Sequence, residues 1–387
     1  MKKLSYIIVA ALALVNTGCS DFLDLSPYSN ANEKAFYKNK SDIETAMISV
    51  YSTLYDVWKP EGLPSFYGEL MSDNAYNTNT AGNVADYDAL DKHSNMTTTN
   101  SVVEGWWETY YKSIYKINQV ISSGSGISGC EEFIGEAKFM RALYYFDMVR
   151  AWGDVPLITT PVSVADSYKK ARTPKAEVYG QIVQDLKDAA EVLPEKSGER
   201  FAGAANRDAA NVLLGKVYLT MGDKENAKTY LMKEYGKFSL ESNYADLWNL
   251  NNKNGKESIF EIQYASTTSS GQPYSPYWAL FTPLDNRTIT AWGAGMNQVT
   301  DDLYNAFEQN DPRRDLTVAE GYEKNGQHVN TTRYCIKWRD TEAPVDKLRE
   351  LARNNFIVLR YADVLLMLTE ATDDPKYLNE VRHRAGL

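Results

Sequence analysis

The segment 131-EEFIGEAKFMRALYYFDMVRAW-152 is the most informative part of this chain. Apolar side chains occupy most sides of the helix that it predicts, and a helix of that kind lies buried among other elements. Gly153 and Pro156 come just after it. Glycine can end a helix and proline cannot continue one, so we expect a central helix over 131–152.

Other segments repeat apolar residues every three or four positions, which is typical of helices packed on neighbours. Ser41 and Glu44 form a capping box that predicts one helix start, and Pro174 suits the first position of another. The predicted helices cover 43–58, 103–121 and 178–193.

Residues 206–235 predict a helix–turn–helix unit that matches the core of a tetratricopeptide repeat. Asn206 suits the first cap and Gly222 the turn. The small Gly215 and Ala227 would let the two helices approach closely. A second helical hairpin is expected over 355–370 and 375–385.

Two long stretches, 60–99 and 267–300, show no helical period, and a β-like run over 258–264 precedes the second. Long irregular segments in compact proteins are often functional. We therefore expect a mainly α fold, in which tetratricopeptide-like helical hairpins form a scaffold with a loop-rich binding face and short β-hairpins.

The charge balance excludes one class of partner. Lys and Arg number 41 and Asp and Glu 51 in 387 residues, which leaves a net charge of −10. A nucleic-acid-binding protein needs a basic face to neutralise phosphates, so we expect no nucleic acid. The three histidines, His93, His328 and His383, show no metal-ligand spacing, and we expect no cofactor.

The first residues are typical of a secretory signal. Two lysines precede an apolar run over 4–15, which is too short to span a bilayer. The residues that follow the run, Asn16-Thr17-Gly18-Cys19, resemble a bacterial lipobox, although Asn16 stands where leucine is usual. We expect 1–18 to be a lipoprotein signal peptide, Cys19 to carry the lipid and 19–387 to form a single domain. An ordinary signal with an incidental cysteine is the alternative.

Two motifs with chemical potential have a simpler interpretation. The run 124-GSGISG-129 has dinucleotide-binding spacing, but a predicted helix precedes it, so a helix–helix loop fits better. Asp86, Asp88 and Asp91 form a weak calcium candidate without the glycine and terminal glutamate of an EF-hand. A solvated acidic loop suits these three residues better.

Paired carboxylates across a cleft would be needed for glycoside hydrolysis. Glu69 with Asp73 and Asp301 with Asp302 are such pairs in sequence. Asp301 and Asp302 better suit the first turn of a helix capped by Thr300, where the helix dipole favours acidic side chains. We therefore expect no catalytic residue.

Aromatic and amide side chains recur in the two irregular stretches. Sugar rings can pack their apolar C–H faces on aromatic planes, while their hydroxyl groups need polar partners. We expect a saccharide platform here, and the alternative is that these side chains only pack their own loops onto the scaffold. The candidate ligand-binding residues are Asn74, Tyr76, Tyr274, Tyr277, Trp278, Asn286, Arg287 and Trp292.

Several blocks of the sequence match one family signature when they are taken together. The blocks are 136-EAKFMRALYYF-146 with 152-WGDVPL-157, 244-YADLW-248, 257-ESIF-260, 359-LRYADVLLM-367 and 379-NEVRHRAGL-387. In this order they closely resemble the SusD/RagB family of outer-membrane nutrient-binding lipoproteins. The blocks are structural, so they point to the family and not to the ligand.

The resemblance implies a tetratricopeptide-like fold and a non-catalytic protein that binds saccharides or another nutrient. It implies a SusC/RagA-type TonB-dependent transporter as the partner that receives the ligand. It implies a position on the outer membrane of a Gram-negative, Bacteroidota-like bacterium, facing the exterior and held only by the lipid. A glycan-processing enzyme and a tetratricopeptide-type peptide-binding module are the alternatives.

The sequence departs from the family at its end. Family members usually continue past Arg-Ala-Gly-Leu into further helices, and this sequence ends at Leu387, so the resemblance leads us to expect that it lacks the family's C-terminal segment. In stacked hairpins each apolar face is covered by the next unit or by a polar cap. We therefore expect apolar side chains over 361–381 to stay exposed and to favour association.

Overall fold

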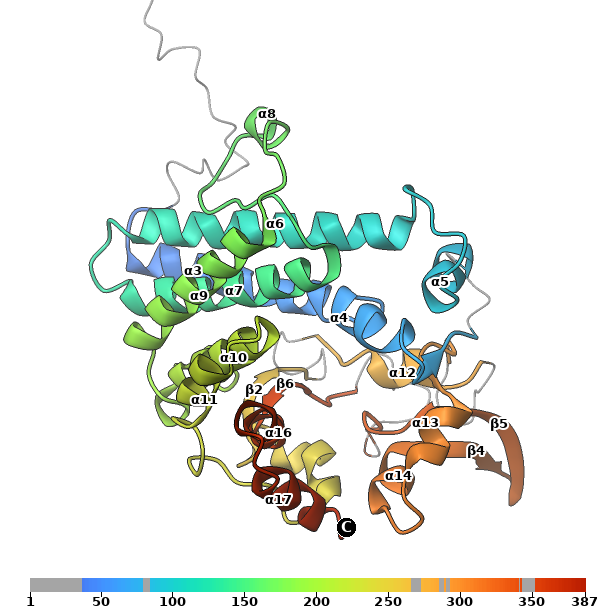
Figure 1. Cartoon of the computed structure of the whole chain (residues 1–387). Helices are drawn as coiled ribbons and strands as arrows, with labels where there is room; N and C mark the ends of the chain where they lie inside the picture. The colour runs from blue at the N-terminus through green and yellow to red at the C-terminus, as the bar shows by residue number, and fades with distance from the viewer. Residues whose placement is uncertain are drawn as a thin grey trace, which may run out of the picture.

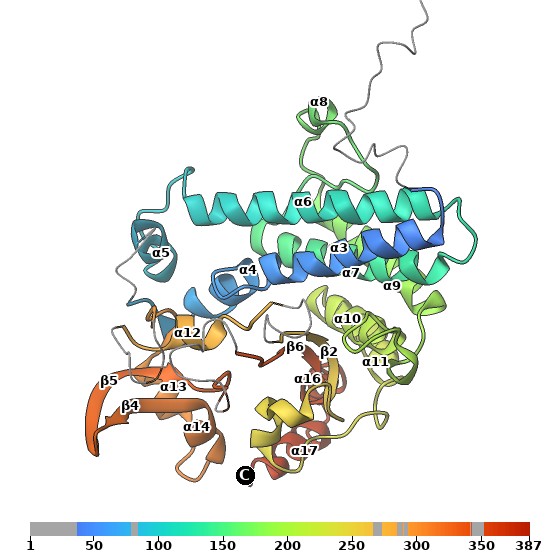
Figure 2. The same ribbon diagram turned by 180° about the vertical axis from the view of Figure 1, so that it is seen from behind.

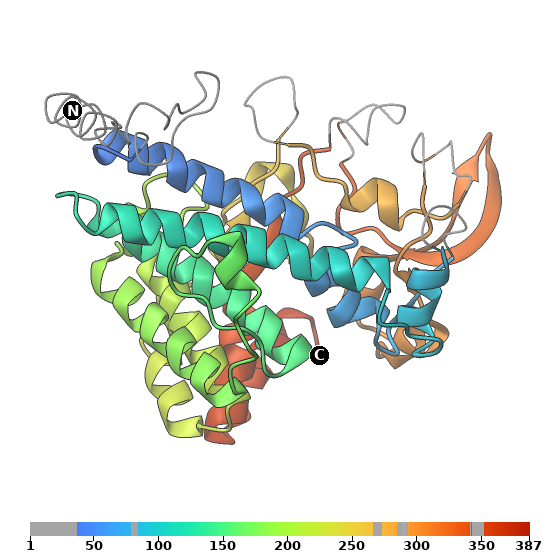
Figure 3. The ribbon, with the colours of Figure 1, turned by 90° about the horizontal axis from the view of Figure 1, so that it is seen from above.

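Long helices fill one half of the molecule, and short helices and strands fill the other (Figure 1). The computed structural model describes residues 37–78, 84–265, 273–284, 289, 293–340, 342 and 352–387. The long helices are α3 (Lys40–Val57), α6 (Ser101–Gly124), α7 (Glu131–Trp152) and α9 (Lys175–Val192). Seen from above, α3 and α6 run side by side along the molecule (Figure 3). The expectation of a mainly α fold is confirmed.

Helix α7 lies at the centre of the helical half. It contacts α3, α6, α9 and α10 (Arg207–Thr220). Its side chains are buried on all sides, including Phe139 and Tyr144 at 0% exposure. Gly153 ends the helix with a φ of +68°, a conformation that glycine adopts without strain. The predicted central helix over 131–152 is confirmed.

Helices α10 and α11 (Lys224–Leu231) form the predicted hairpin. The side chain of Asn206 caps α10 by accepting a hydrogen bond from the Ala209 N–H at 2.8 Å. A methyl group on Gly215 would lie 2.5 Å from Cγ of Leu231, so only glycine allows this close approach of the two helices.

The hairpin of α16 (Tyr361–Thr372) and α17 (Lys376–Arg384) packs on α11. Val364, Leu365 and Leu368 are 0% exposed. The expectation that the apolar side chains of 361–381 stay exposed is therefore wrong for these three and for Met367, which is 4% exposed, because α10, α11 and β6 pack against α16. Leu378 is an exposed residue of the hairpin.

Three antiparallel strand pairs complete the second half. The pair β2–β6 lies between α10 and α16 (Figure 2). The pair β1–β3 joins the two stretches that showed no helical period. The strands are β1 (Ala75–Tyr76), β2 (Ser258–Ile262), β3 (Gln298–Val299), β4 (Val318–Lys324), β5 (Gln327–Cys335) and β6 (Phe356–Arg360), and the third pair is β4–β5.

Short helices connect these elements, and three of them fall within 60–99, where none was expected. They are too short to show a periodic pattern in sequence. The short helices are α4 (Leu63–Ser65), η2 (Phe66–Leu70), α5 (Val84–Asp91), α8 (Val164–Ser167), η3 (Lys196–Gly198), η4 (Tyr244–Trp248), η5 (Leu250–Asn252), α12 (Tyr277–Phe281), α13 (Asp301–Ala306) and α14 (Pro312–Thr317). Thr300 caps α13, as predicted.

Three predicted boundaries are wrong by a few residues. Asn39, and not Ser41, caps α3, because the Asn39 side chain accepts two backbone N–H bonds and Asp42 reaches back to the cap. Pro174 is the cap residue of α9, which begins one residue later. The start of the last hairpin, 356–360, is strand β6, because this apolar run pairs with β2.

The leader lies outside the described residues, so the signal peptide over 1–18 and the lipid on Cys19 stay predictions. Within the described ranges, every helix is too short or too polar to cross a bilayer. The Gly-rich run 124–129 joins α6 to α7, as the loop interpretation predicts.

Candidate functional site

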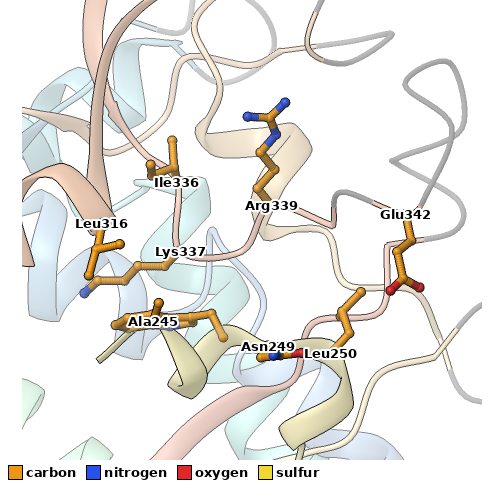
Figure 4. Close-up of a pocket in the computed structure, with 9 residues that line it drawn as sticks. Ala245, Asn249, Leu250, Leu316, Ile336, Lys337, Arg339 and Glu342 are labelled. Carbon is orange, nitrogen blue, oxygen red and sulfur yellow. The ribbon is translucent and has the colours of Figure 1, made fainter. Parts of the chain in front are cut away.

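The described residues enclose a pocket of about 360 Å³ between two short helices and the segment that follows β5 (Figure 4). Helices η4 and η5 form one wall, and residues 336–339 form the other. The lining combines an indole ring, apolar side chains, an amide and charged groups. The lining residues are Ala245, Trp248, Asn249, Leu250, Leu316, Ile336, Lys337, Arg339 and Glu342.

Trp248 is held in the first wall by neighbours on both sides. Asn243 caps η4 by accepting a hydrogen bond from the Ala245 N–H at 3.1 Å. The Tyr244 and Trp248 ring centroids are 4.7 Å apart with the rings at 74°, an edge-to-face contact. The guanidinium of Arg384 lies 5.0 Å over the Tyr244 ring. The half-buried indole is thus tied through Tyr244 to helix α17.

Trp338 anchors the second wall. Its ring stacks on that of Tyr277 with 5.0 Å between the centroids. The flanking residues Lys337 and Arg339 line the pocket instead. The ammonium of Lys337 lies 5.5 Å from the centre of the Trp248 ring, which is within the range of a cation–π contact across the pocket.

The charges of the lining are unevenly compensated. Glu342 accepts a hydrogen bond from Arg353 at 2.9 Å, and Arg353 also binds Asp340 through two hydrogen bonds of 2.8 and 2.9 Å. The hydrogen bonds with Asp340 raise the pKa of Arg353 above its ordinary value, so the guanidinium stays charged. No ion pair joins Lys337 or Arg339 to a carboxylate of the described residues.

The structure buries two of the residues expected to form the aromatic platform. The side chains of Tyr277 and Trp278 in α12 are 0% and 1% exposed. Trp278 packs against Tyr334 at 6.0 Å, and the Arg339 guanidinium lies 5.9 Å over its ring. Neither ring presents an open face to a saccharide in this fold. They support the second wall of the pocket from behind, because Tyr277 stacks on Trp338.

Asn74 and Tyr76 lie at β1 and do not line the pocket. The carbonyl of Asn74 accepts a hydrogen bond from the Thr300 N–H at 3.1 Å, so the two irregular stretches do meet here. Tyr76 is half-buried, and this burial raises its pKa. Tyr274 is half-buried and also away from the pocket lining. Asn286, Arg287 and Trp292 lie outside the described residues.

The weak calcium candidate is dispersed over helix α5. Asp86 accepts hydrogen bonds from the N–H and hydroxyl of Ser101 at 3.0 and 2.5 Å. Asp88 pairs with Lys92 at 2.7 Å, and Asp91 accepts a hydrogen bond from the Asn77 N–H at 3.2 Å. The three carboxylates thus serve separate partners, and the described residues contain no group of three or more acidic, His or Cys side chains suited to a metal.

Sequence reasoning missed the pocket residues. Trp248 belongs to the block 244–248, which supported the family resemblance but was not predicted to bind a ligand. Lys337, Arg339 and Glu342 follow β5 without a recognisable motif. A useful signal was the alternation of cationic and aromatic residues at 337–339, which places charged groups on both sides of the half-buried Trp338 ring.

The arrangement suits binding of a polar molecule with apolar faces. An indole ring offers a plane, and the Asn249 amide with the charged side chains offers hydrogen-bond donors and acceptors. Glu342 is the only carboxylate of the described lining, and it is already paired with Arg353.

Comparison with known proteins identifies the family. A profile described as "Starch-binding associating with outer membrane" matches residues 21–219, and a profile described as "SusD family" matches 314–387. The chain therefore belongs to the SusD-like family, as its sequence blocks predict.

Relatives with this fold include both sequences and solved structures. SusD-like proteins P25 and P2 of Formosa agariphila are 25% and 27% identical, and each alignment covers 100% of this chain and 82% or 81% of the relative. A laminarin binding SusD-like protein superposes with a TM-score of 0.77 at 25% identity over 91% of this chain and 85% of that chain. Surface glycan-binding protein A from Bacteroides fluxus gives a TM-score of 0.75 at 24% identity over 90% of this chain and 81% of that one.

Proposed function

We propose that this protein captures a saccharide in the pocket beside Trp248 and delivers it to a SusC-like TonB-dependent transporter without chemical change. The observation that carries the proposal is the half-buried indole ring facing amide and charged groups in a 360 Å³ pocket. A cavity of this size accommodates a small ligand or a few rings of a longer one.

Membership of the family supports the ligand class. The matching profile is described as starch-binding, and a superposing structure of 25% identity is named as laminarin binding. Both names refer to glucose polymers, yet each pocket sets its own specificity through its side chains. We therefore infer saccharide binding for this chain, without inferring which saccharide it binds.

The proposal includes a place on the outer membrane surface. The family profile is described as associating with the outer membrane, and the described helices do not span a bilayer. A lipid on Cys19 would supply the attachment, since an acidic chain gains little from an anionic membrane. We further propose that the loop-rich half faces outward, because it holds the pocket.

Catalysis and peptide binding are the competing functions. A glycan-processing enzyme would release product and lose that activity on replacement of one carboxylate, whereas the proposed binder retains the saccharide unchanged. A peptide-binding repeat protein would bind on the helical hairpins, away from η4 and η5. Product analysis after incubation with each bound saccharide separates these functions.

The decisive experiment screens a panel of polysaccharides by affinity gel and measures each hit by calorimetry. The replacement Trp248→Ala should weaken binding about tenfold or more, since an aromatic contact contributes on the order of 1 kcal/mol beyond area burial. Trp107→Ala is the matched control, because Trp107 is half-buried on α6 and packs on Tyr111 and Trp152. Equal affinity of the two variants and the unaltered chain would refute the site.

A further inference from the structure

We propose that the pocket beside Trp248 takes an anionic saccharide, one that bears carboxylate or sulfate groups. The inference rests on the proposed function, since it names the ligand class of the same pocket. It begins from the charges of the lining. Lys337 and Arg339 have no carboxylate partner among the described residues, while Glu342 is ion-paired with Arg353, which also binds Asp340. The three charged side chains of the described lining therefore sum to +1.

This excess stands out against the rest of the chain. The protein has a net charge of −10, so a surplus of positive charge in one pocket runs against its overall balance. Lys337 is half-buried, and a cation beside low-dielectric walls attracts an anion more strongly than the exposed Arg339 does, because the walls reduce solvent screening. The pocket is therefore electrostatically complementary to a negatively charged ligand.

Other arginines near the pocket form ion pairs with carboxylates, unlike Arg339. Arg313 pairs with Asp311, and Arg384 pairs with Glu257 at 2.8 Å. These carboxylates are almost fully buried, as is Asp340 behind Arg353. Such buried pairs hold the structure together, because a buried charge needs a partner. Lys337 and Arg339 have no such carboxylate partner among the described residues, so a ligand in the pocket could supply the negative charge.

The directions of the two side chains indicate the form of the ligand. Lys337 runs along the wall toward Leu316, and Arg339 points away from both, toward the top of the view (Figure 4). Trp248 lies on the side of Lys337, with the ammonium 5.5 Å from its ring centre. The two cationic groups therefore face different parts of the pocket. An oligosaccharide with charges on separate sugar rings would place one ring near Trp248 and Lys337 and another near Arg339.

Matched ligands test the inference on the unaltered chain. An oligogalacturonate and its methyl ester have the same rings and hydroxyl groups and differ in charge. Sulfated and unsulfated oligosaccharides of one galactan provide the second pair and separate sulfate from carboxylate recognition. We expect the charged member of at least one pair to bind roughly tenfold more tightly at low salt and to lose this advantage as salt rises.

Matched variants locate the effect. Lys337→Gln and Arg339→Gln should each weaken binding of the charged ligand roughly threefold to tenfold and reduce the difference in affinity between the charged and the neutral partner. Lys324→Gln removes an exposed charge at the end of β4 and should change neither affinity. Helical circular dichroism of each variant checks folding.

The outcomes separate this inference from the proposed function. Equal binding of charged and neutral partners would overturn the anionic class, as would unchanged affinity in both glutamine variants, while saccharide capture would stand. If neutral saccharides of the panel bind and charged ones do not, the inference is wrong and the function holds. If no saccharide binds, the proposed function fails and the inference falls with it.

Discussion

Arg141 of α7 and Asp185 of α9 form a bidentate ion pair with two hydrogen bonds of 2.7 Å, and their side chains are only 4% and 2% exposed. The remaining nitrogen of Arg141 donates to the Asn118 side chain and to the Thr159 carbonyl, at 2.8 Å each. The guanidinium therefore joins α6, α7 and α9 at the centre of the scaffold. Every partner of this buried charge lies on a different segment of the chain.

Removing one partner of this pair should destabilise the scaffold strongly. Asp185→Asn leaves the buried guanidinium uncompensated, and breaking a buried pair costs about 3–5 kcal/mol. The free energy of unfolding from denaturant titration measures the loss. Glu108→Gln is the control, since its ion pair with Lys112 joins side chains that are 62% and 70% exposed and should contribute little. Similar losses in the two variants would contradict this role of Arg141 and Asp185.

Two helical glycines should respond to a methyl group with opposite signs. Gly215→Ala forces the new Cβ against Leu231, 2.5 Å from its Cγ, and overpacking of this kind costs about 1–3 kcal/mol. Gly180→Ala in α9 meets nothing within 4 Å and should stabilise by about 0.5–1 kcal/mol through better helix propensity. Thermal unfolding of both variants tests this prediction. A stabilised Gly215→Ala variant would show that α10 and α11 do not pack this closely.

Stability should fall as pH rises from about 4.5 to about 7 because of Glu234. Burial, and then the nearby negative charge of Asp208, raise the pKa of Glu234 to about 7. In this window the folded chain binds a proton that the unfolded chain has lost, so the free energy of unfolding decreases with pH. Asn211 donates to this carboxyl at 2.7 Å. Glu234→Gln removes the titrating group and should flatten that part of the stability profile. An unchanged slope between pH 5 and pH 7 would contradict the raised pKa.

Replacing the two tryptophans near the pocket should have different consequences. Trp278→Ala empties a buried site and should lower the free energy of unfolding by about 3–5 kcal/mol. Trp248→Ala removes a half-buried ring and should lower saccharide affinity with a smaller loss of stability. Denaturant titration and calorimetry on both variants provide the comparison. A stable Trp278→Ala variant with weakened binding would show that the ring meets the ligand after all.

The helical scaffold was predictable because its signals are local. The apolar sides of 131–152, the Asn206 cap and the small Gly215 all act within one helix or one hairpin, and the structure confirms each. The strand at 356–360 was mistaken for helix because its pairing with β2 depends on residues far away in sequence. The hydrophobic period of one segment does not show whether that segment pairs with a strand far away in sequence.

The site was harder to predict for the same reason. Tyr277 and Trp278 have the composition of a saccharide platform, but α12 turns both rings inward, where they support Trp338 and Tyr334. The pocket brings η4 together with residues after β5, a juxtaposition that exists only in the folded chain. The aromatic composition pointed to the loop-rich half, where the proposed pocket lies, but it could not show that Tyr277 and Trp278 are buried there.

The most direct measurement of the central claim is a crystal structure of the protein with the tightest-binding oligosaccharide of the panel. The expected result is a sugar ring packed on the indole of Trp248, with Asn249, Lys337 or Arg339 within hydrogen-bond distance of the ligand. A ligand bound instead beside Tyr76 and Tyr274, or on the hairpin of α10 and α11, with the Trp248 pocket empty, would contradict the claim.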